Sequence, residues 1–267
     1  LEPADSAWRP LAVFLVALGH IWRGEYDDAE PKLVDLLGSG RPNQALVVYA
    51  LAELALVRLA RDDLEGALSA ADSACTLAAE TGLETVFVSA MAHGAAATAK
   101  LAAGDSLPAD QHLDAARVPM AGVSAAMPID AMHTRIVLAD AAIRLGRISE
   151  ARGYVDDAAR TSRRYRDTGI LAEELVAVSE RLAEADELAP VELSEREQAV
   201  LELLPSELSI REIARALYVS KETIKTHRRR IYQKLSVTSR SDAVVTARQS
   251  GLLPESGDRS AAADDVT

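Results

Sequence analysis

Apolar residues, mostly alanine and leucine, recur every three or four positions over most of the first 187 residues. This spacing is typical of amphipathic α-helices, and almost no stretch alternates as a strand does. A hydrophobic content of 49% with only 4% aromatic residues agrees with helices rich in alanine and leucine. We therefore expect an all-α fold. The helices predicted in this region span residues 7–22, 26–37, 44–60, 64–80, 84–103, 108–117, 129–145, 149–166 and 169–186.

A short junction recurs between the two helices of each predicted pair. Its four copies are GEYDDA at 24–29, DDLEGA at 62–67, GDSLPA at 104–109 and GRISEA at 146–151, whose last alanines are 38, 42 and 42 residues apart. Such a period indicates a helical-hairpin solenoid, which the helix at 169–186 would cap. The junctions resemble tetratricopeptide repeats, although the period exceeds the usual length of about 34 residues. Residues 119–128 (PMAGVSAAMP) are expected to form the one long irregular connection.

Residues 193–253 show a different pattern, four short helices that begin at serines. Ser194 with Glu197, and Ser209 with Glu212, match the capping box, in which each side chain accepts a backbone N–H of the other residue. Two helices should therefore begin near 195 and 210. A turn, YVS at 218–220, precedes a third helix over 221–235, and Ser239 opens a fourth helix that ends near 251. This arrangement predicts a helix-turn-helix.

The third helix of this set has one apolar and one polar face. Ile224, Ile231 and Leu235 fall on a narrow arc, and His227 beside them is interpreted as a packing or hydrogen-bonding residue rather than a metal ligand. Cations dominate the other face. The second helix of a helix-turn-helix points its amino-terminal half at base edges, while other cations contact phosphate. The predicted base-contacting residues are Lys221, Lys225, Thr226 and Arg229, and the predicted phosphate-contacting residues are Arg228, Arg230 and Lys234.

The distribution of charge supports a local nucleic-acid interface. The chain has a net charge of −12, yet residues 193–253 contain 11 Lys and Arg against 7 Asp and Glu. Residues 1–192 contain 17 against 30. Phosphate would repel the acidic part and attract the small basic part. A cationic helix face alone is more often simply solvated, so this contrast adds weight to the DNA interpretation.

The same residues resemble the LuxR-type (GerE-type) helix-turn-helix. The segments that match are LSEREQAVLELL, LSIREIARALYVS, TIKTHRRRIYQKL and SVTSRSDAV. The resemblance implies a DNA-binding transcription regulator in which Lys225, Thr226 and Arg229 face DNA and the fourth helix forms a dimer contact. Val244, Val245 and Ala247 would supply apolar surface for that contact. One difference is LPSELSIREIA, which lacks the glycine that many members have before the second helix, so the shape of this loop is open.

The sequence gives no support for a membrane span, a metal site or a nucleotide-binding loop. The apolar runs are too short or too interrupted by charges to span a membrane, and no signal peptide is present, so we expect a cytoplasmic protein. Cys75 is interpreted as a buried, inert thiol. The histidines show no metal-ligand spacing, and residues 94–101 (GAAATAKL) lack the second glycine and the hydroxyl of a phosphate loop. We predict no enzyme activity, cofactor or metal within the chain.

The predicted organisation is a tetratricopeptide-like domain over 1–187, a linker over 188–192, the helix-turn-helix domain over 193–253 and a disordered tail over 254–267. Helical repeats followed by such a module are similar to the large ATP-binding LuxR regulators, the group of signal-transduction ATPases that includes the maltose-regulon activator. The start at Leu1, within a helical array, suggests the carboxy-terminal part of such a protein. The resemblance implies double-stranded DNA, RNA polymerase, a second copy on DNA and a small-molecule or protein inducer as partners. The alternative is a protein-interaction scaffold whose basic module docks something other than DNA.

Overall fold

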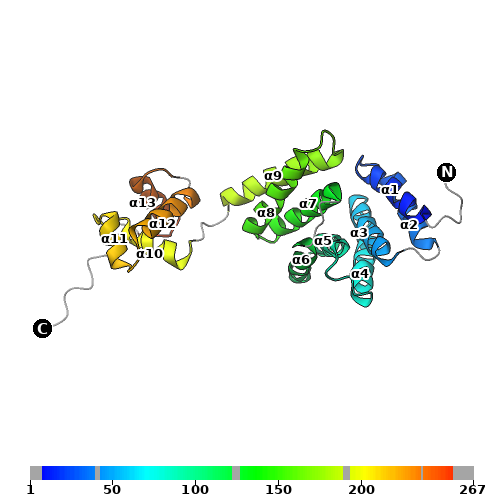
Figure 1. The fold of residues 1–267 in the computed structure, drawn as a ribbon, viewed down its shortest axis with the longest axis horizontal. Coiled ribbons are helices and arrows are strands. Elements are labelled where there is room, and N and C mark those ends of the chain that lie inside the picture. Colours follow the sequence, from blue (N-terminus) through cyan, green and yellow to red (C-terminus); the bar gives the residue numbers. More distant parts are fainter. Residues whose placement is uncertain (1–7, 40–42, 122–126, 189–192, 236, 255–267) are drawn as a thin grey trace. The chain divides into compact units, whose positions relative to one another are not determined.

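The computed structural model describes residues 8–39, 43–121, 127–188, 193–235 and 237–254, and every regular element within them is an α-helix. The predicted all-α fold is confirmed. The chain divides into two compact units, Leu1–Leu188 and Ala189–Thr267, whose helices are labelled in Figure 1. The predicted linker and tail lie outside the described residues, apart from Leu188 and Pro254. Within the described ranges, no helix is long and apolar enough to cross a membrane.

The described part of the first unit consists of helical hairpins stacked in chain order (Figure 1). Within each hairpin the two helices pack together, and the first helices of neighbouring hairpins also contact each other, α3 with α5 and α5 with α7, before α7 contacts α9. The helices are α1 (Arg9–Ile21), α2 (Tyr26–Gly38), α3 (Gln44–Ala60), α4 (Leu64–Glu80), α5 (Phe87–Ala102), α6 (Ser106–Ala121), α7 (Pro128–Arg144), α8 (Ile148–Ser162) and α9 (Ile170–Leu188).

The four sequence junctions share one backbone geometry. Their first residues, Gly24, Asp62, Gly104 and Gly146, have φ of 72°, 61°, 86° and 73°. In each junction the next residue donates its N–H to a carbonyl five residues earlier, at 2.8–2.9 Å, which closes the preceding helix as a Schellman turn. The last alanine of each junction is fully buried. The repeat seen in the sequence is therefore a structural repeat, with aspartate taking the position of glycine once.

Helix α6 differs from the prediction at its carboxy-terminal end. It continues to Ala121 and contains Pro119, although we expected the helix to end near 117 and an irregular segment to begin at 119. A proline in the final turn removes only a single helical hydrogen bond. Pro119 and Met120 are both buried against the unit, and this burial offsets that loss. The remaining part of the expected connection, 122–126, lies outside the described residues.

The segment that partly resembles a phosphate loop, residues 94–101, lies inside helix α5. Its backbone amides are therefore engaged in the helix. Gly94 faces α7, where an added Cβ would lie 3.2 Å from Val137 Cγ1. This glycine serves close helix packing, since a larger residue would push α5 and α7 apart.

The second unit consists of α10 (Glu195–Leu203), α11 (Ile210–Ala216), α12 (Lys221–Lys234) and α13 (Arg240–Gln249) in its described part. Both predicted capping boxes are present, with Ser194 and Glu197 at the start of α10 and Ser209 and Glu212 at the start of α11. A separate apolar core holds the four helices together. Its buried members are Val200, Leu201, Leu204, Ile213, Ala214, Ile224, Ile231, Leu235, Ala243, Ala247 and Leu253.

The glycine-free loop between α10 and α11 is held by a side chain from α13. The guanidinium of Arg240 donates to the carbonyl oxygens of Leu203, Leu204, Ser206 and Leu208 at 3.4, 2.8, 2.5 and 2.9 Å. None of residues 204–209 has a positive φ. The loop therefore needs no glycine, and the free carbonyls at the end of α10 gain charged donors.

Candidate nucleic-acid interface

A tight turn sets α11 and α12 against each other. The Val219 N–H donates to the Ala214 carbonyl at 3.0 Å, and Tyr218 has a φ of 54°. Ser220 then caps α12, because its Oγ accepts the Thr223 N–H at 3.0 Å. The Tyr218 side chain is 97% exposed, so this strained position contributes no core packing. The turn itself fixes the direction in which α12 leaves.

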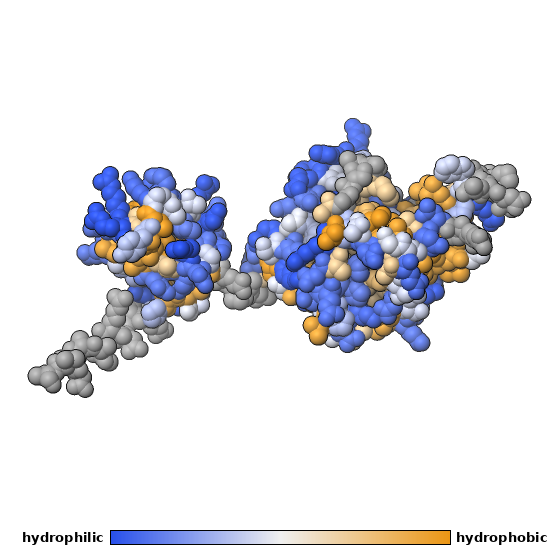
Figure 2. Space-filling view, turned by 60° about the horizontal axis from the view of Figure 1, so that its bottom comes forward, coloured by the Kyte–Doolittle hydropathy of each residue, from blue (hydrophilic) through white to orange (hydrophobic). Residues whose placement is uncertain are grey.

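Helix α12 buries its apolar residues on one side and leaves its cations on the other. Ile224, Ile231 and Leu235 are buried, as the pattern predicted, and His227 is partly buried. We call the remaining surface the exposed face of α12. Its exposed residues are Lys221, Glu222, Lys225, Thr226, Arg229, Arg230, Gln233 and Lys234. On the side of this unit shown in Figure 2, hydrophilic side chains cover most of the surface.

The structure groups three of the predicted cations around one depression. Lys225, Arg228 and Arg229 line a hollow of about 580 Å³, together with Tyr232, Gln233, Val237 and Thr238. Arg228 is half-buried and lies over the ring of Tyr232, with its guanidinium carbon 5.7 Å from the ring centroid. Stacking of this kind fixes the direction of the guanidinium. Lys221 and Arg230 are exposed but do not line the hollow.

Two of the predicted DNA-contacting lysines have acidic partners within the unit. Lys225 Nζ lies 2.9 Å from Glu222 Oε1, an exposed pair on one helix face. The hydrogen bond from Lys225 lowers the pKa of Glu222. Lys234 Nζ lies 2.8 Å from Glu197 Oε2 and joins α12 to α10. Thr226 also donates its hydroxyl hydrogen to the Glu222 carbonyl at 3.1 Å.

The Lys234 contact has a structural role of its own. Glu197 is a buried carboxylate that also accepts the Ser194 N–H of the capping box. Burial raises the pKa of Glu197, but the hydrogen bonds from Lys234 and Ser194 lower it more, so the net pKa is below its usual value. Lys234 therefore compensates a buried charge, and its proposed phosphate contact competes with this partner.

Sequence reasoning missed several residues of this site. Arg240 occurs in the segment SVTSRSDAV, where nothing local shows that its partners lie more than thirty residues earlier. Tyr232 stands four residues after Arg228, the helical spacing at which side chains meet, so this pair could have been predicted. Val237 and Thr238 reach the hollow only because the chain turns back after α12.

The expected dimer surface on α13 needs a correction. Ala247 is fully buried in the core of its own unit, so the prediction that it adds apolar surface for self-pairing is wrong. It lies four residues after Ala243, which is also buried, and small side chains let α13 approach the core closely. Val244 is half-buried and Val245 is 51% exposed.

Residues 191–247 match the family of bacterial regulatory proteins of the luxR type. This range contains α10, α11, α12 and most of α13. A comparison with curated proteins found no match. The family match identifies the second unit as a LuxR-type helix-turn-helix and supports a DNA-binding regulator of transcription.

Proposed function

We propose that the chain binds specific DNA sequences through the exposed face of α12, placed in the major groove. The observation that supports this most directly is the cationic hollow around Lys225, Arg228 and Arg229, on the second helix of a luxR-family helix-turn-helix. The major groove of B-DNA is wide enough for one helix, and an arginine can donate two hydrogen bonds to a guanine. A salt-dependent shift of duplex DNA by residues 190–267 would separate this function from a scaffold role.

Individual residues take different parts in this proposal. Four residues contact bases, because they lie along the exposed face in the first two and a half turns of α12: Lys221, Lys225, Thr226 and Arg229. Arg228 and Arg230 contact phosphates on the two sides. Lys234 contacts phosphate only if it leaves Glu197, which would then be buried and unpaired.

The test compares Arg229→Ala with Arg196→Ala, which removes the same charge from an exposed position on α10. Affinities are measured for a selected site and a scrambled duplex at several salt concentrations. We expect Arg229→Ala to weaken the selected site about tenfold or more and the scrambled duplex much less. Arg196→Ala should change both only slightly. Equal losses for the two variants would mean that α12 does not contact bases.

We also propose that the helical repeats detect a signal molecule. A cavity of about 320 Å³ lies within the first unit, lined mainly by apolar residues of α3, α7 and α9. Its polar lining consists of Tyr26, Thr98, His133, Asp140, Glu174 and Arg181. Glu53 does not line the cavity but is fully buried beside His133, with its Oε1 3.3 Å from His133 Nδ1, and neither carboxylate oxygen has a hydrogen-bond partner among the described residues.

Arg181 of the lining is already paired with Asp140 at 2.8 Å, so the carboxylates of Glu174 and Glu53 favour a small apolar molecule with a cationic group. Burial raises the pKa of Glu174, His133 lowers it and Glu53 raises it, and a bound cation would stabilise both carboxylates. The test is a thermal-shift comparison of benzylamine with neutral toluene, on the parent and on Glu174→Gln. Stabilisation by the amine alone, reduced by Glu174→Gln, is expected. Equal responses to both molecules would exclude an acidic ligand site.

Pairing of two copies on DNA is a further part of the proposal, with the half-exposed Val245 of α13 at the contact. Two modules related by a two-fold axis would then meet half-sites about 34–36 Å apart. The likeness of the whole chain to the large ATP-binding LuxR regulators is also a proposal. A phosphate-loop motif encoded in the same gene would support it.

A further inference from the structure

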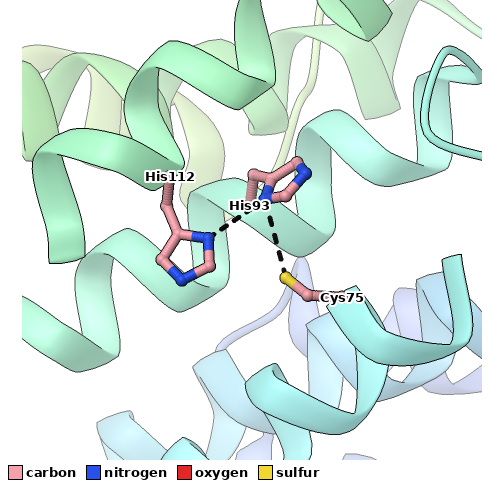
Figure 3. Close-up of side chains that lie close together, drawn as sticks. All are labelled: Cys75, His93 and His112. Carbon is pink, nitrogen blue, oxygen red and sulfur yellow. Dashed lines mark hydrogen bonds between the residues drawn. The ribbon is translucent and has the colours of Figure 1, made fainter. Parts of the chain in front are cut away.

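Three metal-ligating side chains that are scattered in the sequence meet in the repeat unit. Cys75 of α4, His93 of α5 and His112 of α6 point toward one another (Figure 3). Cys75 Sγ lies 3.6 Å from His93 Nδ1, which lies 3.1 Å from His112 Nδ1. Each offers a ligand atom within 4.8 Å of the other two. The sequence separates these two histidines without any metal-ligand spacing, and the hairpin geometry brings them together.

Hydrogen bonds alone do not satisfy this cluster. His93 Nδ1 is the shared neighbour of Cys75 Sγ and His112 Nδ1. In a neutral ring it has either one hydrogen to donate or one lone pair to accept with. His93 Nδ1 can therefore form a good hydrogen bond with only one of its two neighbours. A cation at the centre of the three would accept a lone pair from each atom at once.

The spacing of the atoms fits a tetrahedral ion. Zinc bonds are about 2.3 Å to sulfur and about 2.0–2.1 Å to nitrogen, so tetrahedral angles place two nitrogens about 3.4 Å apart and sulfur and nitrogen about 3.6 Å apart. The observed N–N and S–N distances of 3.1 and 3.6 Å are close to these values. The ligand atoms of Cys75 and His112 lie within 4.8 Å of each other, so these two side chains are the ones that must adjust to place all three ligand atoms on one ion.

The surroundings keep both imidazoles available as ligands. Burial lowers the pKa of His93 to about 4, helped by His112, and burial together with Lys100 lowers that of His112. Both rings are therefore neutral near pH 7 and have free lone pairs. Burial and Asp72 raise the pKa of the Cys75 thiol to about 12. Asp72 and Lys100, paired at 3.0 Å, are the charged groups beside the cluster.

We propose that Cys75, His93 and His112 bind Zn²⁺, with a fourth position left to water or an external ligand. One thiolate and two imidazoles suit zinc, and three protein ligands with an open position form a coordination type that zinc adopts. Binding releases the thiol proton, since zinc takes the thiolate. The ion would link α4, α5 and α6, and so connect two successive hairpins of the repeat array.

The experiment uses the full chain, stripped with a chelator and titrated with Co²⁺ as a spectroscopic substitute for zinc. The chain has one cysteine, so a thiolate-to-cobalt charge-transfer band reports on Cys75 alone. We expect this band, visible bands of tetrahedral Co²⁺, saturation at one equivalent and displacement by Zn²⁺. Cys75→Ser should abolish the charge-transfer band, and His93→Gln or His112→Gln should weaken binding at least tenfold.

His20→Ala is the matched control, because His20 lies beside Glu25 and Asp28 in a second, more exposed group. It should bind Co²⁺ as the parent does. Circular dichroism checks that each variant is folded. Protection of the parent's Cys75 from iodoacetamide by Zn²⁺ gives a readout that needs no variant. Absence of the charge-transfer band, or alkylation at an unchanged rate with Zn²⁺ present, would overturn the proposal.

Discussion

Replacing Arg240 by alanine should destabilise the helix-turn-helix unit more than any other change of an arginine in α13. Its guanidinium donates to four carbonyl oxygens, at 2.5–3.4 Å, at the end of α10 and in the loop before α11. A hydrogen bond from a charged donor contributes about 1.5–3 kcal/mol. The four bonds share one half-exposed group, and water can reach some of the released carbonyls. We therefore expect a loss of about 2–4 kcal/mol rather than the full sum.

The assay is urea unfolding of residues 190–267, followed by circular dichroism. This range contains a separate hydrophobic core. Arg248→Ala is the matched control on the same helix, since Arg248 Nε is buried and has no hydrogen-bond partner among the residues that the structure describes. This variant should lose less than about 1 kcal/mol of stability. Arg240→Lys keeps the charge but cannot spread its donors over four carbonyls, so it should recover less than half of the loss. If Arg240→Ala were no less stable than Arg248→Ala, the loop would not depend on this side chain.

Four further outcomes follow from the structure. Gly104→Ala should lower stability by about 1–2 kcal/mol, because φ is 86° and an added Cβ would meet no described atom within 4 Å that could offset the strain. Asp62→Gly should leave stability unchanged or raise it, because Asp62 has a φ of 61°. Thermal unfolding checks both variants. The stabilisation from Glu197, whose pKa is lowered on folding, is present above pH 4.5 and is lost as the pH falls through the folded-state pKa. Glu197→Gln should therefore have a lower free energy of unfolding than the parent at pH 7 and should lose less stability as the pH falls, as measured by urea titrations at several pH values. If variant and parent lost stability in parallel as the pH fell, the prediction would be contradicted. Val245→Lys should leave the unit folded but weaken cooperative binding to a two-fold symmetric site, as seen in DNA footprints.

Several features follow from local sequence because they depend on neighbouring residues alone. Ser194 and Ser209 mark helix starts, since a serine oxygen satisfies an amide three residues later in any surrounding. The solenoid period was visible for the same reason, because each junction closes its own helix through a left-handed residue such as Gly104. The buried face of α12 also follows from helical spacing.

Which side chains meet was decided only by the packing of the helices in the tertiary structure. Cys75, His93 and His112 stand 18 and 19 residues apart, a separation set by hairpin length rather than by any ligand motif. Lys234, which the sequence predicts to contact phosphate, meets a buried carboxylate because α12 packs against α10. Arg240 stabilises a loop more than thirty residues away. Backbone propensity and periodicity are local properties of the sequence, whereas the partner of a long side chain is determined only when the helices have packed.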